Sequence, residues 1–289
     1  MLQTQLFYDS SPNGFINQRL LTTMIQFASQ LALSDGQKKE LLNALVLQAK
    51  KLLAIWIHYD RFAKEVDRLK PKAPIYEKTA TGHVAVSYSQ ELYLEFDEFL
   101  VQYKSSLDYL AKLPATLLGW NKWNPRTFGD GGKRIIKMLR SVLPKSKKFL
   151  ADQFETLFFE KHRADIEMVV EMRDKINHFV TGGIPYENFR VVGIRQGEKV
   201  EYQVPMWREE QTISDFMSVV FHNHLKFCED FIVFFFHLYL KPGWGFLHRP
   251  VAPDSTVSPW VLIPEAALPL YVGKPGGSSK SAGEPQGNL

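Results

Sequence analysis

The sequence contains a single cysteine, Cys228, among its 289 residues. One thiol cannot form an internal disulfide, which argues against the class of small secreted folds that disulfides stabilise and favours a reducing compartment. The first residues, Met1 to Leu6, contain neither a basic nor an apolar segment, so we expect no signal peptide. We therefore predict a cytoplasmic protein.

Long apolar runs are also absent. The longest extends from Phe231 to Leu240 and is interrupted by His237. A membrane-spanning helix needs roughly 20 apolar residues, about twice this length. The run follows Glu229 and Asp230, so we interpret it as the buried end of a helix and expect no membrane association.

The charge is nearly balanced, with 35 Lys and Arg against 31 Asp and Glu and a net charge of +4. Such a small excess permits a polyanionic partner without requiring one. Aromatic residues are plentiful instead: the 21 phenylalanines predict a core rich in rings. The chain is long enough to bury such a core.

Helical periodicity dominates the pattern of apolar residues. Spacings of three, four and seven predict four principal helices over 38–69, 90–113, 146–180 and 211–240, with shorter helices at 20–33 and 133–143. Ser34 offers a cap before the first of these helices, and Thr212 or Ser214 before the last. The predicted apolar face of the 146–180 helix consists of Phe154, Leu157, Phe158, Asp165, Val169, Met172, Ile176 and Phe179, with Asp165 as its one polar member.

Two β-prone runs, 189–194 and 200–204, interrupt the helical pattern and predict a β-hairpin with a loop of about five residues at 195–199. We therefore predict a mainly α fold, a bundle of four principal helices with this hairpin inserted at 189–204. The predicted organisation is a lead-in over 1–36, a helical domain over 37–241, a proline-rich arm over 242–272 that packs on the body, and a disordered tail over 273–289.

One motif stands near the end of the third predicted helix, where residues Arg173 to His178 read Arg-Asp-Lys-Ile-Asn-His. It resembles the R-x4–6-H signature of the HEPN superfamily (higher eukaryotes and prokaryotes nucleotide-binding domains), including the polar residue that this family prefers directly after the arginine. The context is similar, because HEPN domains are helical bundles whose motif lies late in a long helix, before a loop and a final helix. The resemblance covers roughly residues 40–240 and is specific only at the motif.

The resemblance implies a metal-independent endoribonuclease that acts as a homodimer on RNA. The chemistry is consistent: Arg173 would hold the scissile phosphate and stabilise its developing charge, and His178 would transfer a proton near neutral pH. Asp174 and Asn177 would orient the phosphate or the imidazole. Because the 2′-hydroxyl of RNA supplies the nucleophile, we expect neither a metal nor another cofactor. The family also implies a role as a toxin, with an antitoxin protein as partner, or as a phage-defence effector.

The spacing within the motif poses a geometric problem. Five residues of α-helix turn through about 500°, so Arg173 and His178 point about 140° apart. Either the last helical turn loosens, or two protomers bring their motifs together across a two-fold axis, as the family implies. The alternatives are a plain helix end in which Arg173 pairs with Asp174 or Glu171, a non-catalytic module that binds a nucleotide or a protein, and a structural protein whose arm clamps a neighbour.

A basic cluster follows a glycine-rich loop at 129–132. If it lies beside the motif, it would contact the RNA backbone, and otherwise it is a solvated surface. The loop lacks the spacing of a phosphate-binding P-loop. The predicted RNA-binding residues are Lys133, Arg134, Lys137, Arg140, Lys145, Lys147 and Lys148, together with Lys175 of the motif.

The remaining candidates have simpler explanations. His224 and Cys228 lie four residues apart, but no fourth metal ligand accompanies them and His222 is on another face, so we predict a core helix with a buried cysteine rather than a metal site or a nucleophile. Trp120 and Trp123 would stack on bases if exposed. We favour the interpretation that they fix their loop to the core.

Overall fold

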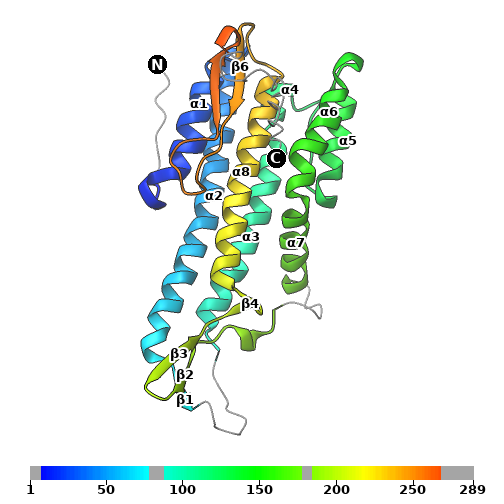
Figure 1. Cartoon of the computed structure of the whole chain (residues 1–289). Coiled ribbons are helices and arrows are strands. Elements are labelled where there is room, and N and C mark those ends of the chain that lie inside the picture. The colour runs from blue at the N-terminus through cyan, green and yellow to red at the C-terminus, as the bar shows by residue number, and fades with distance from the viewer. Residues whose placement is uncertain (1–7, 78–87, 178–183, 268–289) are drawn as a thin grey trace, which may run out of the picture.

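The computed structural model describes residues 8–77, 88–177 and 184–267. Four long helices lie side by side and give the molecule its elongated shape (Figure 1). They are α2 (Asp35–Leu69), α3 (Gln90–Lys112), α7 (Glu160–Asn177) and α8 (Ile213–His237). The prediction of a mainly helical fold is confirmed.

Side-chain caps mark the start of three of these helices, and Ser89 caps α3 by accepting from the N–H of Leu92. The Ser34 hydroxyl accepts from the backbone N–H of Gln37, whose side chain in turn accepts from the backbone N–H of Ser34, so α2 starts with a capping box. Thr212 caps α8 by accepting from the N–H of Asp215 over 3.0 Å. The apolar stripe of α3 is buried throughout, at Leu92, Phe96, Phe99, Tyr103, Leu107 and Leu110.

The third predicted helix differs from a continuous α-helix. It consists of α6 (Phe149–Phe154), a π-helical segment (Glu155–Phe159) and α7. A π-turn adds one residue to the turn, and Phe159, which the predicted face did not include, is buried five residues after Phe154. Further along the predicted face, Val169 is buried, and Met172 and Ile176 are partly buried against the core. Ile166 and Val169 continue the buried face, and the predicted end of the helix at 180 lies outside the described residues.

The N-terminal segment lies in the core. A 3₁₀ turn (Pro12–Gly14) leads into a π-helical segment (Asn17–Thr22) and α1 (Thr23–Ala28), so the helix begins and ends earlier than predicted. Phe15, Leu20 and Met24 have no exposed surface. The remaining short helices are α4 (Ala115–Leu118), α5 (Lys133–Val142) and 3₁₀ turns at Lys70–Lys72, Asp130–Gly132, Lys145–Lys147, Tyr186–Asn188 and Glu265–Ala267.

A small sheet lies at one end of the bundle, near the bottom of Figure 1. β2 (Val192–Gln196) pairs antiparallel with β3 (Lys199–Gln203), and β1 (Ile75–Glu77) adds in parallel to β2. Pairing continues to Gln196 and Lys199, so a two-residue turn replaces the five-residue loop that the sequence predicted. Gly197 occupies this turn with a φ of 64°, which favours glycine. A short ladder, β4 (Met206–Arg208) with β5 (Gln211–Thr212), precedes α8.

The C-terminal arm covers the opposite end of the bundle (Figure 1). β6 (Trp244–His248) and β7 (Trp260–Pro264) form an antiparallel hairpin, which the sequence did not predict. The Phe246 ring lies 5.1 Å from that of Phe27 in α1, and the Trp260 indole donates to Asp230 of α8 over 2.8 Å. The predicted tail at 273–289 lies outside the described residues.

Within the described part of the chain, one helical segment, Asp35–Lys72, is long and apolar enough to span a membrane, and 44% of its apolar window is buried inside the protein. A core helix meets the same criterion of length and composition. The expectation of no membrane partner stays a prediction.

Candidate functional site

Arg173 lies near the end of α7 with 32% of its side chain exposed. Its Nη1 donates to the Asp174 carboxylate over 2.9 Å. The same guanidinium interacts electrostatically with Asp97 of α3. Burial and the neighbouring Glu98 raise the pKa of Asp97, while Arg173 lowers it. The motif arginine is therefore held among carboxylates from two helices, and its contact with Asp174 is the pairing expected of a plain helix end.

The partner of Arg173 in the motif, His178, lies outside the described residues. Asn177 ends the described part of α7, and its side chain is likewise not described. The geometry between Arg173 and His178 thus stays a prediction.

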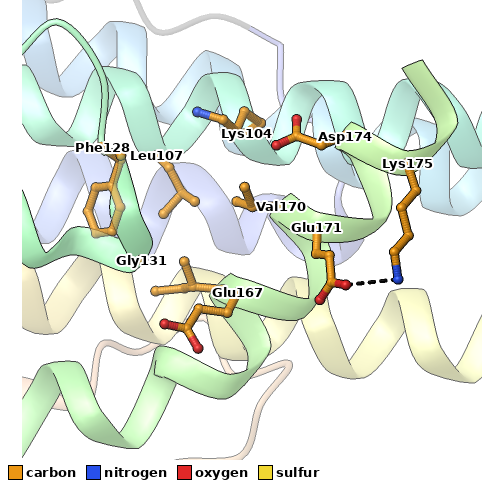
Figure 2. Close-up of a pocket in the computed structure, with 11 residues that line it drawn as sticks. Lys104, Leu107, Phe128, Gly131, Glu167, Val170, Glu171, Asp174 and Lys175 are labelled. Carbon is orange, nitrogen blue, oxygen red and sulfur yellow. Dashed lines mark ion pairs between the residues drawn. The ribbon is translucent and has the colours of Figure 1, made fainter. Parts of the chain in front are cut away.

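A groove of about 660 Å³ runs beside the motif between α3, α7 and the loop at 128–131 (Figure 2). Carboxylates dominate its charged lining: Glu167, Glu171 and Asp174 oppose the ammonium groups of Lys104 and Lys175. Lys175, a predicted RNA-binding residue, pairs with Glu171 over 2.8 Å, which Figure 2 marks with a dashed line. Because like charges repel, this groove disfavours a phosphate and favours cationic or hydrogen-bond-donating groups.

Three tyrosines form a cluster near Asp97, and one of them, Tyr93, lies one helical turn before Asp97 on α3. Tyr93 packs against Tyr186 with ring centroids 4.4 Å apart, and Tyr88 lies 5.6 Å from Tyr186. Tyr88 is 50% exposed and Tyr186 44% exposed. Burial, Tyr186 and Asp97 together raise the pKa of Tyr93. Sequence reasoning missed this cluster, because no local pattern links Tyr88 with a residue almost a hundred positions away.

The predicted basic cluster is placed elsewhere. Lys133 begins α5 next to the groove-lining loop, but the turn from α5 to α6, which carries Lys145, Lys147 and Lys148, lies at the end of the molecule away from the last turn of α7 (Figure 1). Arg140 is occupied by ion pairs with Asp152 and Glu155. The structure therefore does not gather this cluster around Arg173. The lysines at 133, 137, 145, 147 and 148 are exposed, as a solvated surface requires.

Of the other singled-out side chains, Trp123, His224 and Cys228 are buried in the core, and the prediction that Trp120 fixes its loop to the core is wrong. Trp123 is buried and donates from Nε1 to the Ala111 carbonyl over 2.7 Å, whereas Trp120 is 51% exposed. His224 contacts the Ser106 hydroxyl over 2.8 Å, and burial lowers its pKa to about 3. Burial also raises the pKa of the Cys228 thiol, which opposes formation of a thiolate. Among the described residues no group of three or more His, Cys, Asp or Glu is arranged to hold a metal ion.

Comparisons with protein-family models, curated proteins and solved structures find no match for this chain.

Proposed function

We propose that the protein is a metal-independent endoribonuclease of the HEPN type, active as a homodimer. The observation that carries the proposal is the sequence Arg-Asp-Lys-Ile-Asn-His at 173–178, at the end of a bundle helix that is followed by a final long helix, α8. The partly exposed guanidinium of Arg173 supports it, because a phosphate needs access to that group.

The proposed reaction uses the RNA's own 2′-hydroxyl. This oxygen loses its proton and attacks the adjacent phosphorus, the bond to the 5′-oxygen breaks, and that oxygen receives a proton. The products carry a 2′,3′-cyclic phosphate and a free 5′-hydroxyl. Arg173 would stabilise the charge that develops on the phosphoryl oxygens, and His178 would supply the proton.

Phosphate binding requires that Arg173 exchange its contact with Asp174 for one with the RNA. Both partners are partly exposed, at 32% and 47%. An ion pair of this kind contributes about 0–1 kcal/mol, so a phosphate can replace it at little cost. The Asp174 carboxylate would then remain beside the bound phosphate, as the polar residue that the HEPN resemblance expects directly after the arginine.

A second protomer matters to this proposal because one chain offers a single Arg173, which lies beside the carboxylates of Asp97 and Asp174. A two-fold axis near the end of α7 would bring a second Arg173 and a second His178 into one cleft, so that two guanidinium groups could contact the same phosphate. We accordingly expect activity to depend on dimerisation.

The test is cleavage of a fluorescently labelled single-stranded RNA in the presence of a chelator. We expect the wild type to cut, and Arg173→Ala and His178→Ala to lose activity by two to four orders of magnitude while keeping their thermal stability and oligomeric state. Arg61→Ala is the matched control, since Arg61 is an exposed helical arginine on α2. Equal cleavage by all four proteins would remove the proposal. The toxin role is tested separately, by growth arrest on expression and its relief by His178→Ala.

A second candidate function is a non-catalytic binding module, which the acidic groove favours. The three carboxylates that line this open groove of about 660 Å³ would bind a basic peptide segment of a partner protein. Binding of such a segment that Glu167→Gln weakens, together with an absence of RNA cleavage by the wild type, would establish this alternative.

A further inference from the structure

A second cavity, of about 270 Å³, lies between the N-terminal π-helical segment, α8 and the C-terminal arm and shares no lining residue with the groove beside the motif. The charged and titratable side chains that line it are all basic: Arg19, His222, Lys226, His248 and Arg249. Of the lining residues that the structure describes, none is acidic. Prolines 250, 253 and 259 of the arm form much of the remaining wall.

Two buried carboxylates, Glu229 and Asp230, hold cations of this cavity in place. Arg19 donates from Nε and Nη2 to Glu229, and from Nη1 to the Pro253 carbonyl over 2.8 Å. Lys226 donates to Asp230 over 3.3 Å. These hydrogen bonds fix the positions of both cations.

Donors remain after these contacts are counted. A guanidinium has five N–H groups, and Arg19 uses three of them on described residues. The ammonium of Lys226 uses one N–H on Asp230 and one on His248. Arg249 makes no side-chain hydrogen bond or ion pair within the described part of the chain, and its side chain is exposed. The cavity thus presents cationic N–H groups from three separate segments to one small volume.

The two histidines face the cavity in a form that cannot donate from Nε2. His222 Nδ1 lies 2.8 Å from the Ser218 carbonyl, which only accepts, so Nδ1 carries the proton and Nε2 is a lone pair in the neutral ring. His248 Nε2 lies 3.3 Å from the Lys226 ammonium, which only donates, so this nitrogen is also a lone pair. Each ring becomes a donor at Nε2 only by taking up a proton.

The surroundings keep both rings neutral at pH 7. Burial lowers the pKa of His222 most strongly and Arg19 lowers it further, whereas the Ser218 carbonyl and Asp254 act in the opposite direction. Burial, Lys226 and Lys161 lower the pKa of His248, against the effect of Asp230. A negative charge in the cavity would oppose these influences and favour protonation.

We propose that this cavity binds a small phosphate-type dianion through Arg19, Lys226 and Arg249, and that binding is coupled to proton uptake by His222. The volume exceeds that of a phosphate group, so the free ion and the terminal phosphate of a mononucleotide both fit. The bound anion joins α8 to the arm, so it also stabilises the folded protein by mass action. This inference concerns a different part of the molecule from the proposed ribonuclease site and does not depend on it.

The experiment measures binding to the full chain by calorimetry and thermal shift at constant ionic strength. Sulfate is the probe of pH dependence, because its charge does not change between pH 6 and pH 8. We expect saturable binding of sulfate that is several-fold tighter at pH 6 than at pH 8. His222→Asn, which keeps a donor for Ser218 but cannot take up the proton, should abolish most of this difference. Inorganic phosphate and adenosine monophosphate at pH 8 then identify the source: tighter binding of the nucleotide indicates a mononucleotide site, and equal affinity indicates the free ion.

Arg249→Ala tests the site itself, because Arg249 is exposed and its replacement leaves the buried ion pairs intact. We expect about tenfold weaker binding, the usual loss for one charge-assisted hydrogen bond. Arg190→Ala is the control, as an exposed arginine before β2 at the other end of the bundle, and should bind like the wild type. The proposal is overturned by an absence of saturable binding, by equal affinities of the two alanine variants, or by wild-type affinity for sulfate that does not change with pH.

Discussion

Replacing Arg19 by methionine is the sharpest test of how the N-terminal segment is fixed to the bundle. Arg19 and Glu229 form an ion pair in which the side chains are 3% and 0% exposed. The arginine also donates to the Pro253 carbonyl and thereby anchors the C-terminal arm. Arg19→Met keeps most of the side-chain volume but leaves the Glu229 carboxylate buried without its cation.

The expected loss follows from that burial. Removing one partner of a buried ion pair costs about 3–5 kcal/mol, because the other charge remains desolvated. For a chain of this size each kcal/mol lowers the melting temperature by roughly 2 °C, so we expect a decrease of roughly 6–10 °C. Replacing both partners by methionine removes the isolated charge as well, and the double variant should recover most of the loss.

The pH dependence of the loss has a definite sign. Burial raises the pKa of Glu229 even with Arg19 present, and removal of the arginine raises it further. A carboxyl group whose pKa is higher in the folded than in the unfolded protein destabilises the fold once pH exceeds its unfolded pKa, and this penalty disappears as pH falls below that value. Arg19→Met should therefore lose more stability at pH 8 than at pH 5, relative to the wild type at each pH.

Thermal and urea unfolding at these two pH values measure the effect, with the double methionine variant as control. A loss below about 1 kcal/mol for Arg19→Met, or an equal loss for the single and double variants, would refute the assignment of a desolvated ion pair.

Three further predictions concern packing, reactivity and substrate contact. Gly132→Ala should lower the free energy of unfolding in urea by roughly 2–4 kcal/mol, because φ is +81° and the new Cβ would lie 1.9 Å from the buried Phe159 ring. Gly197→Ala, where φ is +64° but the space around the new Cβ is open, should lower it by only about 1 kcal/mol. Cys228 should resist thiol reagents in the native protein at pH 8 and react after unfolding in urea, since it is buried and its pKa is raised; fast native labelling would contradict its position. If RNA is the substrate, Tyr186→Ala should raise KM about tenfold by removing a stacking surface, with kcat nearly unchanged, and the exposed Tyr109→Ala should change neither.

The sequence was sufficient to predict the long helices that have an uninterrupted apolar period. The apolar periods of α2, α3 and α8 continue for several turns, and a serine or threonine cap marks where α2 and α8 begin. The π-turn after Phe154 was not predictable in this way, because one added residue rotates the following face by about 100° without changing composition. Phe159 is buried as a result, at a position that the predicted face did not include.

Contacts between distant segments were beyond sequence reasoning for a different reason. Arg19 and Glu229 are 210 positions apart and look like ordinary surface charges in the sequence. At the motif, the contact of Arg173 with Asp174 was foreseeable because the two are adjacent, while Asp97 and the tyrosines near it come from other elements. The basic cluster at 133–148 was recognisable as a cluster, but its distance from α7 depends on the packing of α5 and α6.

Cleavage of single-stranded RNA by purified wild-type protein and by His178→Ala, in a metal-free buffer, tests the ribonuclease proposal most directly. We predict that the wild type generates fragments ending in a 2′,3′-cyclic phosphate and that His178→Ala, with the same melting temperature and oligomeric state, generates almost none. Identical fragment yields from the two proteins, or none from either across a broad panel of RNA substrates, would contradict it.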